Sequence, residues 1–384
     1  MIRALILVSL IPSAFGKIGL RFVRDGIHDR SLSTILETAA GEEVVESIFD
    51  FQSETVYLVH GEGEGFVDDP GVELHDSTLV SQHLDSAALW NLDRVDDVCG
   101  RSDGVYQYLD HDPDDEDKLS QVVVYILDTG VNPHVDLGGR LMSGRNFVSD
   151  CVNDVTDERS HGTFVATLVA GDRAGTCRKD CLIYPVKVVD ASGSGSVTNV
   201  IRGIAHAVQH CLENAPQKCI IVNLSLGTWY NSAMNQMVKF ATSHGVMVFV
   251  SAGNQFSDAC NVSPASASSA WTVGASNRYD ELAYFSNSGD CVDFYSPGRS
   301  VLGGNLNGGF SIKSGTSMAS LTAAGLVAKF WLEHDDLVAS EMSWRIRRLV
   351  EESPKTDLAI LVRHHGWRGP SSVSMLSANE TEFI

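Results

Sequence analysis

Three side chains spread along the sequence could together perform nucleophilic catalysis. Asp128 follows an apolar run in Leu127-Asp-Thr-Gly130, His161 lies in Ser160-His-Gly-Thr163, and Ser317 lies in Ser314-Gly-Thr-Ser-Met-Ala-Ser320. A serine hydroxyl is a poor nucleophile until a neighbouring imidazole accepts its proton, and that imidazole needs a carboxylate to orient it and stabilise its charge. The three residues therefore predict Ser317 as a nucleophile, His161 as a general acid/base and Asp128 as the orienting carboxylate.

Other enzyme classes arrange such residues differently. Asp-Thr-Gly also occurs in aspartic proteases, but these enzymes need two such carboxylates, and the sequence contains no second Asp-Thr-Gly or Asp-Ser-Gly. The chain order Asp, His, Ser is that of subtilisin, whereas α/β-hydrolases run Ser, Asp, His and carry a full Gly-x-Ser-x-Gly. Taken singly, His161 fits a helix cap or core residue and Ser317 an ordinary N-cap. Their combination favours a catalytic site.

The segments around these residues predict an α/β domain. From about residue 119, continuous apolar runs alternate with helical stretches, which is typical of parallel strands covered on both faces. The expected strands are 122–127, 182–189, 219–224 and 246–250, and the expected helices are about 162–170, 197–214, 231–243 and 340–352. This alternation predicts a doubly wound parallel sheet, with the functional residues at the carboxyl ends of its strands.

The blocks around Asp128, His161 and Ser317 resemble the three signature blocks of the subtilases, the subtilisin-like serine proteases. Further matches occur in family order over about residues 88–332. They are Val186-Lys-Val-Val-Asp190, Gly193-Ser-Gly-Ser196, Asn223-Leu-Ser-Leu-Gly227, Ser251-Ala-Gly-Asn254, Phe285-Ser-Asn287 and Ser296-Pro-Gly298. Two more, Ser263-Pro-Ala-Ser266 and Thr272-Val-Gly-Ala-Ser276, are similar to the proteinase K branch. The resemblance implies a subtilisin-like fold and a serine endopeptidase of protein or peptide substrates that needs no cofactor for catalysis.

The same resemblance assigns further site residues. Asn254 is implied as the side chain of the oxyanion hole, where its amide and the Ser317 backbone N–H would meet the developing oxyanion. The S1 pocket is implied to lie between two segments that hold Ser225, Leu226, Gly227, Ala252 and Gly253. Three departures leave substrate specificity open. Ser320, Leu321 and Thr322 follow Ser-Met-Ala where the family usually has Pro and His, Phe164 stands where many members repeat a His, and Thr228 replaces a Gly.

A structural calcium site and a disulfide are also implied by the resemblance. Proteinase K-like enzymes hold calcium with one carboxylate and backbone carbonyls, which places Asp293, Ser268 and Ala270 as ligands. The alternative is that Asp293 is a turn residue. Of the eight cysteines, which allow 105 pairings, Cys260 and Cys291 are the pair that the family supports. Local bridges from Cys177 to Cys181 and from Cys211 to Cys219 remain open, as does a zinc role for His206 and His210, for which a surface helix pair is the better explanation.

The N-terminal part differs in charge from the rest. Residues 17–86 contain 15 acidic and 4 basic residues, so this segment carries −11 of the total net charge of −21. It has strand-like runs at 18–23 and 55–59, a helical pattern at about 32–49 and a short run at 72–75. By the resemblance, residues 17–86 form a small α+β, ferredoxin-like propeptide that inhibits the enzyme until it is cut. Self-cleavage is expected between about Gln82 and Leu89, before Trp90-Asn-Leu-Asp-Arg-Val95, which resembles the start of mature proteinase K-like domains.

The ends of the sequence and its charge bear on location and partners. Residues 1–16 read as a cleaved secretory signal peptide, with a basic start, an eight-residue apolar run and small residues before Lys17. Residues 87–384 are then the catalytic domain with a short C-terminal tail. A net charge of −21 argues against nucleic-acid and membrane partners. We expect a secreted, monomeric zymogen. The alternative from another class is a non-catalytic binding protein with a protease fold, kept inert by its propeptide.

Overall fold

The computed structural model describes a large part of the chain. The described residues are 17–24, 43–51, 54–60, 67–68, 71–74, 89–96, 106, 122–214, 218–222, 226–334, 337–352 and 359–361. The expected signal peptide, the cleavage region from Gln82 to Ala88, the Ser-rich tail and the substrate-pocket residue Ser225 lie outside them. Within the described residues, no helix is both long enough and apolar enough to cross a bilayer.

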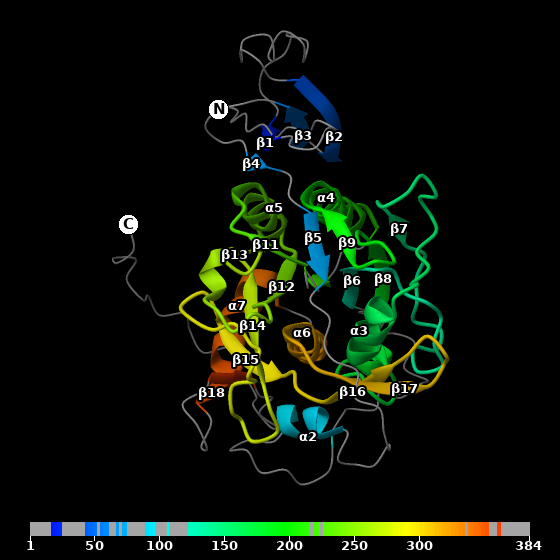
Figure 1. Ribbon diagram of the computed structural model, residues 1–384, viewed down its shortest axis with the longest axis vertical. Coiled ribbons are helices and arrows are strands. Elements are labelled where there is room, and N and C mark those ends of the chain that lie inside the picture. Colours follow the sequence, from blue (N-terminus) through cyan, green and yellow to red (C-terminus); the bar gives the residue numbers. More distant parts are fainter. Residues whose placement is uncertain are drawn as a thin grey trace.

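A nine-stranded sheet forms the centre of the molecule (Figure 1), in the order β18-β19-β15-β14-β12-β10-β6-β8-β7. Every neighbouring pair is parallel except β18 with β19. The strands are β6 (Val122–Asp128), β7 (Arg145–Asn146), β8 (Cys181–Lys187), β10 (Lys218–Val222), β12 (Met247–Ser251), β14 (Trp271–Ser276), β15 (Phe294–Pro297), β18 (Val350–Glu352) and β19 (Ala359–Leu361). The chain adds strands to one side of β6 and then to the other, which makes β6 the switch point of a doubly wound sheet.

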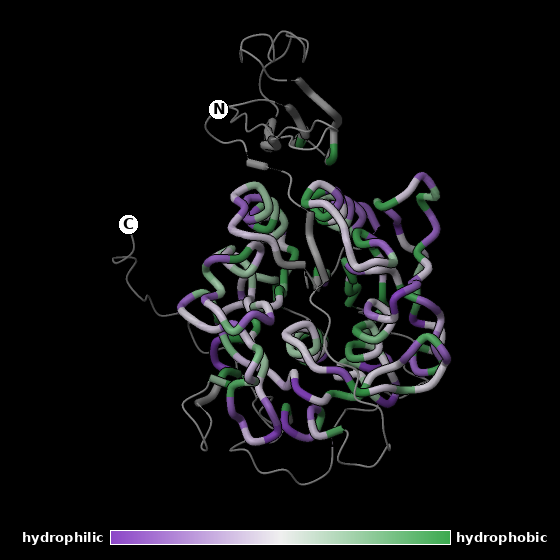
Figure 2. The backbone as a smooth tube through the Cα atoms, viewed as in Figure 1, coloured by the Kyte–Doolittle hydropathy of each residue, from purple (hydrophilic) through white to green (hydrophobic). Residues whose placement is uncertain are grey.

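Helices cover both faces of this sheet, as the alternation in the sequence predicts. The helices are α2 (Trp90–Asp96), α3 (His161–Ala170), α4 (Val197–Asn214), α5 (Ser232–Ser243), α6 (Thr316–Leu332) and α7 (Ala339–Leu349). Along β6, side chains alternate between two cores: Val122, Val124 and Ile126 pack with α3 and α6, whereas Val123, Tyr125 and Leu127 pack with α4 and α5. Figure 2 shows hydrophilic residues gathered in the outer loops.

The N-terminal part forms a separate sheet. Its order is β2-β3-β1-β4, with β1 (Lys17–Arg24), β2 (Glu43–Phe51), β3 (Glu54–His60) and β4 (Val67–Asp68), and its pairs are antiparallel. The helix expected over 32–49 is wrong for its second half, because Glu43–Phe51 pairs with β3 as a strand. Val44, Val45, Ile48 and Phe49 are residue types that favour a strand. This sheet lies against the α/β domain, with β2 next to α4 and β1 next to α5 (Figure 1).

A short strand links the two parts. β5 (Gly71–Leu74) lies between β9 (Ser194–Ser196) and β11 (Leu226–Trp229), and β13 (Val262–Ser263) pairs with the far edge of β11. β5 runs antiparallel to both neighbours, with Leu74 opposite Leu226 and Gly71 opposite Ser196. An extended N-terminal segment is therefore inserted between two strands of the α/β domain.

Three disulfides lie in the α/β domain. They join Cys177 to Cys181, Cys211 to Cys219 and Cys260 to Cys291, with Cα–Cα distances of 5.8, 6.3 and 5.2 Å. The expected Cys260–Cys291 pair and both local bridges are thus formed. Cys151 is exposed and outside any disulfide, and the eighth cysteine, Cys99, lies outside the described residues.

Candidate active site

Asp128 and His161 form a buried hydrogen-bonded pair. Asp128 is the last residue of β6, and His161 is the first residue of α3. Nδ1 of His161 lies 2.9 Å from Oδ1 and 2.8 Å from Oδ2 of Asp128, and the two side chains are 0% and 1% exposed. A carboxylate that holds Nδ1–H leaves Nε2 of the imidazole as the proton acceptor. The pair therefore has the tautomer that a general base requires.

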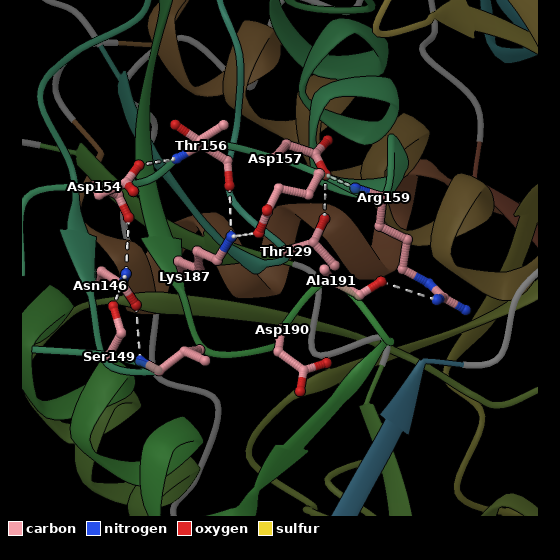
Figure 3. A network of polar contacts seen from close by, with 12 residues as sticks. Thr129, Asn146, Ser149, Asp154, Thr156, Asp157, Arg159, Lys187, Asp190 and Ala191 are labelled. Carbon is pink, nitrogen blue, oxygen red and sulfur yellow. Dashed lines mark hydrogen bonds and ion pairs between the residues drawn. The ribbon is translucent and has the colours of Figure 1, made fainter. Parts of the chain in front are cut away.

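A second carboxylate, Asp157, fixes the loop that leads to His161 (Figure 3). Its Oδ1 accepts the backbone N–H groups of Arg159 and Ser160, and its Oδ2 accepts that of Thr163. The Thr129 hydroxyl lies 2.8 Å from Oδ1 of Asp157 and 3.1 Å from Oδ1 of Asp128, so its one proton serves either carboxylate. Sequence reasoning missed Asp157, although an Asp shortly before a helix start is a typical capping signal.

Ser317 occupies the start of the central helix α6. It is the second residue of that helix, so its backbone N–H lies in the first turn, where N–H groups have no acceptor within the helix. The side chain is 2% exposed, and α6 packs against α3, which carries His161. Among the described residues, no hydrogen bond joins Ser317 to His161. Catalytic hydrogen bonds often tighten only when substrate is bound.

Asn254 is oriented by the residue before Ser317. The backbone N–H and the hydroxyl of Thr316 both donate to Oδ1 of Asn254, each at 2.9 Å. Because Oδ1 accepts both of these hydrogen bonds, the orientation of the side-chain amide is fixed, with its donor hydrogens on the opposite end at Nδ2. Thr316 Oγ1 also accepts the backbone N–H of Gly253 at 3.2 Å. The role of Thr316 was not foreseen from the sequence.

Of the expected substrate-pocket residues, all except Ser225 lie in the described part of the chain. Leu226 and Gly227 lie on β11, directly opposite β5, and Ala252 is fully buried next to Gly253. Gly253 has φ +103°, and a Cβ at this position would lie 2.4 Å from Nδ2 of Asn287. That nitrogen donates to the Ala252 carbonyl at 2.8 Å. Asn287 therefore supports the segment that carries Gly253 and Asn254.

Arg159 connects the loop before His161 to the segment that precedes β9, one of the two strands that flank β5. Its Nη1 donates to the carbonyl of Ser192 at 2.6 Å. The same nitrogen lies 3.4 Å from the carbonyl oxygen of Ala191 (Figure 3). These residues precede β9, one of the two strands that flank β5. The guanidinium therefore positions β9 relative to His161.

The expected calcium ligands only partly fit a cation. Asp293 is exposed at its residue surface, and its Oδ2 already accepts the Thr272 backbone N–H at 2.8 Å. Burial raises the pKa of Asp293, while the Thr272 N–H and the positive charge of Arg347 act in the opposite direction. A neighbouring guanidinium disfavours a metal ion, and no cluster of three acidic, His or Cys side chains lies among the described residues. The site at Asp293, Ser268 and Ala270 stays a prediction.

His206 and His210 bind tyrosines rather than standing free on the helix surface. His206 Nε2 lies 3.0 Å from the Tyr184 hydroxyl, and His210 Nδ1 lies 2.9 Å from the Tyr125 hydroxyl. Both imidazoles are half-buried against the sheet, and burial lowers the pKa of His206 to about 4. Burial likewise raises the pKa of the Tyr184 hydroxyl. The pair is part of the packing between α4 and the sheet.

A doubly wound sheet with a buried Asp–His pair at the end of β6 and a serine at the start of a central helix defines the subtilisin class of serine proteases. The chain belongs to the subtilase family: the family model Peptidase_S8, described as "Subtilase family", matches residues 120–367. It is a subtilisin-like serine endopeptidase with a subtilisin-like fold.

The chain is similar to several fungal and bacterial proteases. It is 36% identical over 303 residues to a subtilisin-like protease of Coccidioides posadasii, which covers 77% of this chain and 74% of the relative. It is 42% identical over 207 residues to proteinase T of Parengyodontium album, covering 54% of this chain and 70% of the relative. The crystal structure of a cold-adapted subtilisin-like serine proteinase matches with a TM-score of 0.64 and 33% identity, covering 72% of this chain and 98% of that one.

Proposed function

We propose that the protein is a secreted serine endopeptidase made as a self-processing zymogen, in which Ser317, His161, Asp128 and Asn254 carry out the reaction. The observation that carries this proposal is the buried hydrogen-bonded pair of His161 and Asp128 at the carboxyl end of β6. Ser317 Oγ attacks the scissile carbonyl as Nε2 of His161 takes its proton, and His161 then passes the proton to the leaving amine. The oxyanion accepts hydrogen bonds from the Asn254 amide and the Ser317 N–H.

Labelling with a fluorophosphonate tests this assignment. The reagent forms a covalent bond with an activated serine, so we expect a single adduct on Ser317 in the processed protein and none in a Ser317→Ala variant. Asp128→Asn, which leaves the size of the side chain unchanged, should retain the fold but label and turn over about 10⁴-fold more slowly. Absence of an adduct from processed, folded protein would favour the alternative, a non-catalytic binding protein.

The N-terminal part is proposed to be the inhibitory propeptide, residues 17–86, of a catalytic domain that covers 87–384. Two observations support this. The sheet β2-β3-β1-β4 lies against α4 and α5, and β5 occupies the place between β9 and β11 where an extended substrate would pair with both strands. While β5 stays there, a substrate strand has no edge to bind.

The position of β5 also bears on the bond that is cut. Leu74 lies opposite Leu226, a residue of the proposed S1 pocket. The proposed boundary at residue 86 requires a cut between about Gln82 and Leu89, and a cut shortly after Leu74 is the alternative that this register offers. N-terminal sequencing of the processed protein distinguishes the two. A new N-terminus at residues 83–89 would support the proposed boundary, one shortly after Leu74 would support the alternative, and processing of a Ser317→Ala variant expressed alone would contradict self-cleavage.

Secretion as a monomer completes the proposal, and a structural calcium ion stays an expectation from the family resemblance. Three disulfides suit an oxidising compartment, which supports the expected signal peptide at 1–16. Acidic composition supports protein or peptide substrates rather than nucleic-acid or membrane partners.

A further inference from the structure

A buried lysine lies just before the proposed nucleophile in the chain. Lys313 is the last residue of β17 (Phe310–Lys313), which pairs antiparallel with β16 (Val301–Gly304), and it precedes Ser317 by four residues. Lys313 is 5% exposed, and a lysine is seldom buried to this extent without a partner. Its Nζ donates to the backbone carbonyl of Ser160 at 2.9 Å. This hydrogen bond joins the segment of the proposed nucleophile to the residue that precedes the proposed general base.

The backbone of Ser160 has a conformation that its side chain makes costly. Its φ is +73°, in the left-handed region that residues with a Cβ seldom adopt. The Ser160 N–H donates to Oδ1 of Asp157, and the Ser160 carbonyl accepts from Lys313. His161 follows directly as the first residue of α3. The placement of His161 therefore depends on a strained residue that is held at its N–H and at its carbonyl.

Phe164, one of the three departures from the family pattern, packs beneath the ammonium group of Lys313. Nζ of Lys313 lies 5.0 Å from the centroid of the Phe164 ring. This ring is fully buried, and a Cβ on Gly303 of β16 would lie 2.8 Å from its Cζ atom. The face of an aromatic ring attracts a cation. Phenylalanine at position 164 therefore suits a lysine at position 313.

Two other hydrogen bonds fix the hairpin of β16 and β17 near α3, which lies beside it in Figure 1. The Gly304 N–H donates to the hydroxyl oxygen of Thr167 on α3 at 2.8 Å, and Nε2 of His134 lies 2.8 Å from the Gly309 carbonyl oxygen. Both bonds lie at the turn of the hairpin. Lys313 lies at its open end, where the chain continues towards α6. Lys313 is therefore placed to fix the end of the hairpin that leads to the proposed nucleophile.

We infer that Lys313 is a positioning residue of the proposed catalytic site, because its ammonium group holds the Ser160 carbonyl and thereby places His161 relative to Ser317. The inference rests on the proposed function. Without the ammonium group, Ser160 relaxes out of the left-handed region and carries the start of α3 with it. A displacement of about 1 Å in a catalytic geometry can lower a rate by about 10²-fold. The main effect is on kcat, because the ammonium group acts on the general base and not on the substrate.

Kinetics of processed protein with an internally quenched peptide test this role. Lys313→Met keeps an unbranched apolar stem but removes the ammonium group, so we expect kcat to fall about tenfold with KM nearly unchanged. Lys313→Arg restores a charged donor and should recover part of the loss. Each variant is assayed after processing is complete. A wild-type kcat in Lys313→Met would overturn the inference.

Lys218→Met is the matched control. Lys218 is 8% exposed and donates to the backbone carbonyl of Trp331, and its Nζ lies 5.8 Å from the centroid of the Trp331 ring. It therefore resembles Lys313 in burial, acceptor and aromatic neighbour, but it lies at the opposite end of α6 from Ser317. Lys218→Met should leave kcat unchanged. An equal fall of kcat in both variants would mean that the loss follows from removing any buried lysine, and the inference would be wrong.

Ser160→Gly tests whether Lys313 acts through Ser160. Glycine adopts a φ of +73° without a steric penalty, so the left-handed conformation then depends less on the ammonium group. We expect Lys313→Met to lower kcat about tenfold in the wild-type chain but less than about threefold in the Ser160→Gly chain, because the two positions are coupled. Equal losses in the two chains would contradict an action through Ser160.

Hydrogen exchange separates this inference from the proposed function, because it needs no activity. In a Ser317→Ala chain, which lacks the proposed nucleophile, Lys313→Met should speed exchange of the Ser160 amide by about tenfold, whereas Lys218→Met should leave it unchanged. If the wild-type protein cuts no peptide but exchange rises in this way, the proposed function fails and the hold of Lys313 on Ser160 stands. If the wild-type protein cuts peptides and Lys313→Met matches it in kcat and in exchange, the inference fails and the proposed function stands.

Discussion

At the scale of single residues, the groups with distinctive chemistry could be predicted and the groups that hold them could not. Asp128 and His161 are hydrogen-bonded as the sequence predicts. Thr316 and Asp157 were missed because their roles depend on which loops meet in three dimensions. A Thr next to a Ser, or an Asp in a loop, gives no sign in sequence of the distant N–H or amide that it will contact.

Thr316→Val tests the orienting role of the Thr316 hydroxyl. Valine keeps the shape of the side chain and the backbone N–H but loses the hydroxyl that donates to Oδ1 of Asn254. We expect kcat to fall about tenfold with KM nearly unchanged. The Asn254 amide acts mainly in the transition state, where negative charge develops on the substrate oxygen, so a poorly oriented amide slows the reaction without weakening substrate binding. Asn254→Ala removes the amide altogether and should lower kcat by a factor on the order of 10²–10³. This is the largest loss of kcat that misorienting the amide in Thr316→Val could cause. If Thr316→Val kept full activity while Asn254→Ala lost it, the Thr316 hydroxyl would have no orienting role.

At the scale of elements, period and composition predicted the catalytic domain well and the N-terminal part less well. The expected strands 122–127 and 246–250 correspond to β6 and β12, and the expected helix 197–214 corresponds to α4. Each is long or continuously apolar, so its pattern is unambiguous. Residues 43–51 have apolar residues that suit either a helix face or a strand, and their pairing with β3 settles the outcome.

Helix α6 contains one of the three departures from the family pattern, the Ser320-Leu321-Thr322 sequence, and burying its hydroxyl groups costs stability. Ser320 and Thr322 are fully buried, and their hydroxyls have no hydrogen-bond partner among the described residues. An unsatisfied buried hydroxyl destabilises the folded state by about 1–3 kcal/mol. We therefore expect Ser320→Ala to raise the free energy of unfolding by about 1 kcal/mol, measured by urea denaturation of inactive Ser317→Ala protein to avoid self-digestion.

Thr176→Val is the matched control for this prediction. The Thr176 hydroxyl lies 3.1 Å from the Thr322 carbonyl and 3.3 Å from the Leu168 carbonyl, so its loss leaves acceptors unpaired. Thr176→Val should lower the free energy of unfolding by about 1 kcal/mol, opposite in sign to Ser320→Ala. A destabilised Ser320→Ala would mean that its hydroxyl has a role in the native state.

At the scale of the whole molecule, charge and packing separate the two parts of the chain. Residues 17–86 carry −11 and the remainder −10, so loss of the N-terminal part would halve the net charge. The sequence predicted that division, but it could not predict that the junction is an inserted strand. β5 is only four residues long, and its pairing with β9 and β11 depends on strands more than 100 residues away in the chain.

The histidine and tyrosine cluster behind the sheet should make the stability of the whole domain sensitive to acid. In the folded state the pKa of His206 is about 4, lowered by burial and then by His210 and Arg145, whereas Glu213 raises it. The ordinary value in an unfolded chain is about 6.5. Between these values the unfolded state binds the extra proton, so the free energy of unfolding decreases as pH falls from about 6.5 towards 4.

His206→Gln isolates this contribution, because glutamine can still bond to the Tyr184 hydroxyl but does not titrate. Relative to wild type, both in the Ser317→Ala background, the variant should lose about 2 kcal/mol less stability between pH 7 and pH 5 in urea denaturation. His206 and Gln209, both on α4, line one surface pocket, so Gln209→Ala is the control and should keep the wild-type slope. Identical slopes for wild type and His206→Gln would mean that the imidazole titrates alike in the folded and unfolded chains. The acid sensitivity of the domain would then have to come from its carboxylates, which outnumber basic residues throughout the chain.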